Sequence, residues 1–125
     1  MSDSKPNVPP KKRGVSRLLA AAGYSVAGLR SAFGSEEAFR LEVVGLVVLT
    51  PLALWLGESS LERVLMIGSV LLLLIVELLN TAVESVVNRV GLEFHELSRQ
   101  AKDIGSAAVF LAMAMVALVW IGLLI

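Results

Sequence analysis

Val64–Val87 reads VLMIGSVLLLLIVELLNTAVESVV, and this stretch decides the fold. It is apolar and long enough to cross a bilayer core of about 30 Å as one helix. Its only charged residues are Glu77 and Glu84, and Asn80 lies between them. The spacing i, i+3, i+7 places all three polar side chains on one helical face. A carboxylate at membrane depth is costly, so this face is a candidate functional site.

The other apolar segments predict an all-α integral membrane protein. The uncharged C-terminal run is long enough to span, whereas Val43–Leu56 is shorter and contains Pro51. We expect that shorter run to span together with the turn before it. Apolar residues at three- and four-residue steps in Val15–Phe33 predict an amphipathic surface helix; a simple packing helix is the alternative. The expected elements are a surface helix at 15–33 and transmembrane helices at 38–56, 64–87 and 104–125.

Composition supports a membrane protein with one main domain. The chain has 125 residues, of which 56% are hydrophobic, and its mean hydropathy is +0.78. That is too apolar for an ordinary soluble domain of this size. The Pro- and Lys-rich residues 1–14 predict a disordered basic tail, and residues 15–125 a single membrane domain. There is no cysteine, which excludes thiol chemistry.

The distribution of Lys and Arg predicts the orientation. Basic residues are frequent before the first span and in the loop 88–103, whereas the loop 57–63 has only Arg63. The positive-inside rule puts the N-terminus and the loop 88–103 in the cytoplasm and the C-terminus outside. At ~1.5 Å per residue, Glu77 lies roughly 21 Å from Arg63 and Glu84 roughly 31 Å. Glu77 is therefore expected inside the cytoplasmic leaflet and Glu84 at its surface. This depth suits a reaction between a lipid and a water-soluble reagent.

Further polar groups converge on the same membrane surface and suggest phosphoryl transfer. Carboxylates with an asparagine suit Mg²⁺, and Lys and Arg suit phosphates. With a base to orient a hydroxyl, these are the parts of a phosphoryl-transfer site. The glycine-rich phosphate-binding motifs of soluble nucleotide domains are absent, so an ATP site must come from helix ends and is expected to be shared between subunits. The additional residues are Glu36, Glu37, Arg40, Glu42, Glu93, His95, Glu96, Lys102 and Asp103.

Two other classes of function remain open on the residues alone. Glu77 suits the carrier carboxylate of a small proton-coupled transporter or channel. The polar groups equally suit helix assembly in a non-catalytic membrane subunit. His95 is by itself more typical of a solvated loop, and Ser106 of a small helix-packing residue. The basic run Lys11–Arg13 favours attraction to a membrane surface over nucleic acid.

Four sequence blocks resemble the small bacterial diacylglycerol kinases, a family of trimeric integral membrane enzymes. They are AAGYSVAGLRSAF (21–33), EEAFRLE (36–42), VELLNTAVESVVNRVG (76–91) and EFHELSRQAKDIGSAA (93–108). The resemblance covers Arg17–Ile125. It implies ATP-dependent phosphorylation of diacylglycerol to phosphatidic acid at the cytoplasmic face of the inner membrane. It also implies a Mg²⁺ cofactor and a homotrimer. A sister branch of the family phosphorylates undecaprenol.

The resemblance also implies roles for individual residues. Glu77 matches the proton-accepting base, Asn80 the amide beside it, and Glu36 and Glu84 the metal-binding carboxylates. Asn88 stands where the family usually has aspartate, and Leu41 where glutamine is common. The implied ATP-binding residues are Arg17, Tyr24, Glu36, Glu84, Glu93, Phe94, His95, Lys102 and Asp103. The implied lipid-binding residues are Arg17, Ala21, Gly23, Tyr24, Ser25, Arg30, Ser31, Ala32, Phe33, Ala38, Phe39, Arg40, Glu42, Trp55, Arg63, Glu77 and Ser106.

Overall fold

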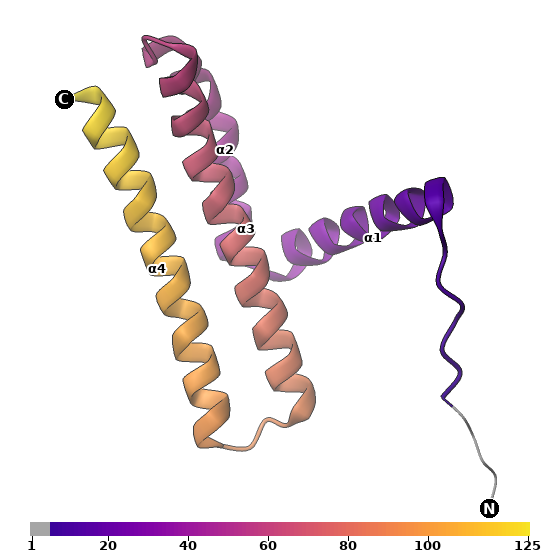
Figure 1. Cartoon of the computed structure of the whole chain (residues 1–125). Helices are drawn as coiled ribbons and strands as arrows, with labels where there is room; N and C mark the ends of the chain where they lie inside the picture. Colours follow the sequence, from indigo (N-terminus) through magenta and orange to yellow (C-terminus); the bar gives the residue numbers. More distant parts are fainter. Residues whose placement is uncertain (1–5) are drawn as a thin grey trace, which may run out of the picture. The chain divides into compact units, whose positions relative to one another are not determined.

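The structure, a computed structural model, describes residues 6–125 and contains four helices within them (Figure 1). They are α1 (Gly14–Ser35), α2 (Glu37–Leu56), α3 (Ser60–Val90) and α4 (Glu96–Leu124). The described residues form no strand, which confirms the predicted all-α fold class. Of the predicted tail, residues 6–13 have no regular secondary structure, and Met1–Lys5 lie outside the described residues.

Three of the helices are long and apolar enough to cross a membrane, as predicted: α2, α3 and α4. They have 20, 31 and 29 residues. At 1.5 Å per residue, α2 is about 30 Å long, the thickness of a bilayer core. By the same measure α3 and α4 are each about 45 Å long, so they continue beyond the core as helix. Their extra turns carry the polar residues that follow Glu77.

The start of α4 differs from the prediction. The uncharged run suggested a helix from residue 104, but α4 begins at Glu96 and the loop shrinks to residues 91–95. His95 is its N-cap, and the ring Nδ1 accepts a hydrogen bond from the backbone N–H of Leu97 at 3.1 Å. Arg99 forms ion pairs with Glu96 and Asp103, at i−3 and i+4. The cap and the side-chain pairs stabilise helix in this charged part of the sequence, before the uncharged run begins.

The chain divides into two compact units, which meet between Ser31 and Ala32 within α1. In the first unit, the described residues up to Ser31 include most of α1. Its side chains are exposed except for the half-buried Ala20, and the Ser25 hydroxyl donates to the carbonyl of Ala21 at 2.9 Å. A helix this open is compatible with the surface helix predicted for residues 15–33, whose location at a membrane stays a prediction.

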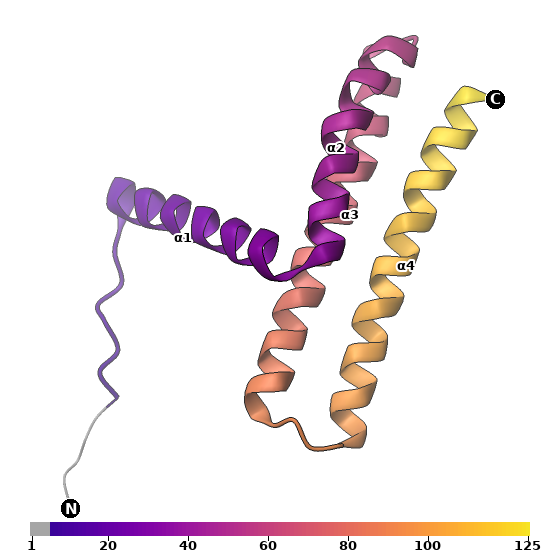
Figure 2. The same ribbon diagram turned by 180° about the vertical axis from the view of Figure 1, so that it is seen from behind.

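In the second unit, Ala32–Ile125, α3 packs against both α2 and α4 (Figures 1 and 2). Phe39 and Met66 are the largest fully buried side chains. The indole N–H of Trp120 donates to the carbonyl of Met66 at 3.0 Å, which ties α4 to the first turns of α3. Many large apolar side chains of the three helices are exposed, as lipid-facing surfaces require. The main core consists of Ala32, Phe39, Val70 and Leu74, flanked by Val43, Leu46, Leu49, Leu78, Val116 and Trp120.

The turn between α2 and α3 depends on a glycine. Gly57 is buried, and a Cβ atom there would lie 2.5 Å from Cγ of Arg63 and 2.8 Å from the carbonyl oxygen of Ala53. The backbone N–H of Gly57 also donates to that carbonyl at 2.9 Å. Because the carbonyl belongs to the backbone, it cannot turn away from an added methyl group. Gly57 is therefore required for the close approach of the two helix ends.

We expect Gly57→Ala to lower the free energy of unfolding by about 1–3 kcal/mol, the usual cost of overpacking. Gly45→Ala in α2 is the matched control, because a Cβ there meets nothing within 4 Å. Helix propensity alone should raise the free energy of unfolding of that control by up to about 1 kcal/mol. Thermal unfolding in detergent measures both variants. Equal melting temperatures would contradict the packing argument.

Candidate functional site

Glu77 is the central polar residue of the second unit. Its exposed fraction is 6%, and Ser69 is the other buried polar residue among residues 6–125. The Ser69 hydroxyl donates to the carbonyl of Met66 at 2.8 Å, so its own helix satisfies it. A buried carboxylate cannot donate a hydrogen bond to a carbonyl of its own helix in this way, and its burial is costly without a partner. Glu77 therefore marks the candidate site.

Further carboxyl groups surround Glu77. Glu42 from α2 lies within side-chain contact of Glu77, and Glu36 and Glu84 lie close enough to act on it electrostatically. Glu36 is the N-cap residue of α2, so the start of that helix brings it to the level of Glu77. One oxygen of Glu42 is buried without a hydrogen-bond partner. The cluster thus joins the beginning of α2 to the second half of α3.

Among residues 6–125, no basic side chain forms an ion pair with this carboxylate cluster. Arg40 lies next to it in sequence, but its guanidinium donates to the carbonyls of Phe33 at 2.9 Å and Gly34 at 3.2 Å. It therefore caps the last turn of α1. Within the described part of the chain, the ion pairs are those of Arg99, and none involves a carboxylate of the cluster. Among the described residues, these four carboxyl groups therefore give this part of the molecule an excess of negative charge.

Asn80 contacts a different carboxylate from the one expected. Its Nδ2 donates to Oε1 of Glu84 at 3.4 Å, one turn further along α3, whereas Glu77 turns toward α2 and Glu42. The amide therefore supports the expected metal ligand rather than the expected base. Oδ1 of Asn80 is buried without a hydrogen-bond partner. The amide is thus enclosed between α3 and α4.

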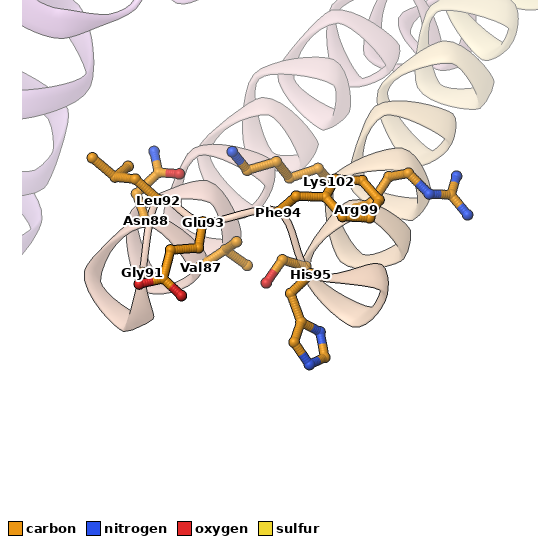
Figure 3. Close-up of a pocket in the computed structure, with 10 residues that line it drawn as sticks. Val87, Asn88, Gly91, Leu92, Glu93, Phe94, His95, Arg99 and Lys102 are labelled. Atoms are coloured by element: carbon orange, nitrogen blue, oxygen red, sulfur yellow. The ribbon is translucent and has the colours of Figure 1, made fainter.

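A hollow of about 330 Å³ lies where the α3–α4 loop folds over the two helix ends (Figure 3). Lys102 extends into it toward Asn88, whereas the guanidinium of Arg99 and the ring of His95 point away. Asn88 follows Glu84 by one helical turn, so the hollow continues the polar stripe of α3. It is lined by Val87, Asn88, Gly91, Leu92, Glu93, Phe94, His95, Ser98, Arg99 and Lys102.

Lys102 and Asp103, neighbours in sequence, have different surroundings. The Asp103 carboxylate accepts a hydrogen bond from Arg99 at 2.8 Å, while Lys102 lines the hollow. Consecutive residues of a helix point about 100° apart, so one of the pair turns from the hollow when the other enters it. The sequence did not assign Arg99 a role, although its i+4 spacing to Asp103 is a recognisable signal.

Several predicted lipid-binding residues are either packed in the core or distant along the chain from the carboxylate cluster. Ala32 and Phe39 are buried in the core, which gives them a packing role. Trp55 is exposed at the end of α2, and Arg63 is in the first turn of α3, roughly 21 Å from Glu77 along the helix. Ser106 is exposed on α4. The first unit, which is described by itself, contains Arg17, Ala21, Gly23, Tyr24, Ser25, Arg30 and Ser31.

Comparisons with known proteins agree on one family. A family profile described as "Prokaryotic diacylglycerol kinase" matches residues 23–124. The chain is 52% identical to a diacylglycerol kinase of Haemophilus influenzae, over 91% of this chain and 97% of that protein. The diacylglycerol kinase of Pseudomonas aeruginosa is also 52% identical, over 90% of this chain and 91% of the relative. That of Escherichia coli is 50% identical, over 86% and 88% of the two chains.

Burial of the Glu77 carboxyl group among other carboxylates should weaken the fold. We expect Glu77→Gln to raise the free energy of unfolding by on the order of 1 kcal/mol, because the amide keeps the shape without charge repulsion. Glu93→Gln is the control, since Glu93 is exposed in the loop. Thermal unfolding in one detergent compares the two. A drop in stability for Glu77→Gln would mean that its charge is compensated.

Proposed function

This chain belongs to the family of prokaryotic diacylglycerol kinases, and from this premise we propose that it transfers the γ-phosphoryl group of ATP to diacylglycerol. The product is phosphatidic acid. The observation that carries the proposal is the buried Glu77 in a group of carboxylates without a basic partner. Glu77 would act on the lipid, and Glu84, two helical turns further along α3, would bind the metal with Glu36 from the start of α2.

We assign Glu77 the role of general base. As the lipid hydroxyl oxygen bonds to the γ-phosphorus, its proton passes to the Glu77 carboxylate. The bond from that phosphorus to the bridging oxygen breaks, and ADP leaves with the electron pair. With 6% of its surface exposed, Glu77 has little access to water, which disfavours hydrolysis of ATP in place of transfer. A direct transfer of this kind needs no phosphorylated enzyme.

The residues around Glu77 fit Mg²⁺. This ion is usually held by one or two carboxylates together with substrate phosphates, rather than by a protein cage. The described residues contain no group of three or more His, Cys, Asp or Glu arranged to hold a metal alone, so the ion would need ligands from the substrate phosphates. Glu36 and Glu84 would hold the ion. When bound, it would offset the charge of the transferring phosphoryl group.

The hollow at the α3–α4 loop is our candidate for the nucleotide. Lys102 offers a cation to the phosphates, and Glu93, Phe94 and His95 form the loop beside it. Asp103 would contact the nucleotide only after its ion pair with Arg99 is broken. The family resemblance also assigns Arg17 and Tyr24 to nucleotide binding, and that assignment stays a prediction. At about 330 Å³ and bounded on one side by a five-residue loop, the hollow encloses only part of a nucleotide.

Assembly and location follow from the same proposal. Many apolar side chains of α2, α3 and α4 are exposed, and some of them would face other copies of the chain. We propose a homotrimer with active sites shared between subunits. The enzyme would lie in the bacterial inner membrane, with its N-terminus and its active sites on the cytoplasmic side and its C-terminus outside. It would serve phospholipid metabolism by returning diacylglycerol to phosphatidic acid.

The direct test is transfer of labelled phosphate from MgATP to a short-chain diacylglycerol by the pure protein in lipid. We expect labelled phosphatidic acid from the wild type, and a loss of at least about 100-fold for Glu77→Gln, the scale of general base catalysis. Undecaprenol is assayed in parallel. A faster reaction with undecaprenol would assign the chain to the sister branch. Folded protein that labels neither lipid would favour a transporter or an assembly subunit.

Lys102 and Arg99 provide a matched pair on the nucleotide side. Lys102 enters the hollow while Arg99 points away from it. We therefore expect Lys102→Ala to raise the KM for MgATP about tenfold, the scale of one lost charge-assisted hydrogen bond. Arg99→Ala should change it less than about twofold, since surface ion pairs contribute little. Steady-state kinetics at saturating lipid measures both. Equal effects would show that the nucleotide binds elsewhere.

A further inference from the structure

Gly105 of α4 faces the side chain of Asn80 on α3. A Cβ atom built on Gly105 would overlap with Oδ1 of Asn80, and would lie 3.3 Å from its Cγ and 3.9 Å from its Cβ. All three nearest atoms belong to this one side chain, and no backbone atom of α3 is among them. A Cβ atom built in the same way on Gly122, which is also in α4, would have nothing within 4 Å.

The missing side chain therefore makes room for an amide. Oδ1 of Asn80 is buried against α4 without a hydrogen-bond partner, and Nδ2 on the other side of the amide donates to Glu84 at 3.4 Å. An added methyl group at residue 105 would force the amide to turn. Because the amide is rigid and planar, turning Oδ1 also displaces Nδ2 from Glu84.

We propose that Gly105 is a positioning residue. Because it has no side chain, it leaves a space between α3 and α4 that fixes the position of the Asn80 amide. The amide in turn fixes the position of the Glu84 carboxylate. The expected effect of Gly105 on metal and nucleotide binding rests on the function proposed above. The contact between Gly105 and Asn80 does not depend on that function. Groups that orient a metal ligand typically change metal affinity or activity by 10–100-fold when they are removed.

A simpler role for Gly105 is close packing of the helices. Ala101, Gly105 and Ala108 lie on the side of α4 that borders an apolar groove of about 390 Å³ against α3. Small residues at such a contact let helix backbones approach. The two roles differ in the atoms that meet the added methyl group. Backbone contacts would force the helices apart, whereas the three nearest atoms here all belong to the Asn80 side chain.

The test compares Gly105→Ala with Gly122→Ala in the full chain, labelled with ¹⁵N-asparagine in detergent. The chain has only three asparagines, Asn7, Asn80 and Asn88, so their side-chain NMR signals are few, and Asn80→Ala assigns the one that matters. We expect Gly105→Ala to shift the Asn80 signal and Gly122→Ala to leave it unchanged. An unmoved Asn80 signal in Gly105→Ala would overturn the proposal without reference to catalysis.

Kinetics and a double variant then separate positioning from packing. Gly105→Ala should raise the Mg²⁺ concentration for half-maximal activity about tenfold, with a melting temperature close to that of Gly122→Ala. In an Asn80→Ala background, adding Gly105→Ala should change activity less than about twofold, since coupled residues are not additive. An equal loss in both backgrounds would overturn the proposal.

Two further outcomes are decisive. If Gly105→Ala does not fold, recovery of folding in the double variant supports the amide clash, and failure of the double variant refutes it. If the wild type phosphorylates no lipid, the proposed function fails, while the NMR comparison still decides whether Gly105 positions Asn80.

Discussion

The second unit is organised around one costly constraint, which is the burial of the Glu77 carboxyl group in an apolar helix. Glu42 faces it from α2, and Glu36 and Glu84 add charges of the same sign. Such a cluster is unfavourable in an empty protein and becomes favourable when a cation is present. The core of Phe39, Val70 and Leu74 on the same α2–α3 interface offsets this cost and keeps the carboxylates together.

Helix length and helix contact then set where the chemistry takes place. Because α2 is about as long as a bilayer core is thick and α3 is longer, α3 has enough length to carry the polar stripe from Glu77 beyond the core as helix. In the function proposed above, this single helix joins the lipid end of the site to its nucleotide end. Asn80 lies between them, and its amide links the expected metal ligand Glu84 to the surface of α4.

Much of this arrangement is predictable from the sequence because it depends on single helices. The apolar run around Leu71–Leu74 requires a span, and the spacing of Glu77, Asn80 and Glu84 requires one face. Contacts between helices are harder to predict. The small residues Ala101, Gly105 and Ala108 indicate a packing face on α4, but they do not indicate which side chain of α3 meets Gly105. The start of α4 at Glu96, before the uncharged run, depends on the His95 cap and the ion pairs of Arg99, which hydropathy does not measure.

The position of Glu77 within α3 also bears on how this helix enters the bilayer during synthesis. On a translocon scale, a charged residue at the centre of a span costs about 2.5–3.5 kcal/mol, and each Leu, Ile or Val returns about 0.3–0.6. The seven residues VLLLLIV just before Glu77 return about 2–4 kcal/mol by that measure. Hence α3 carries its own driving force for insertion. Its carboxylate can meet Glu42 afterwards, when helices already in the membrane associate.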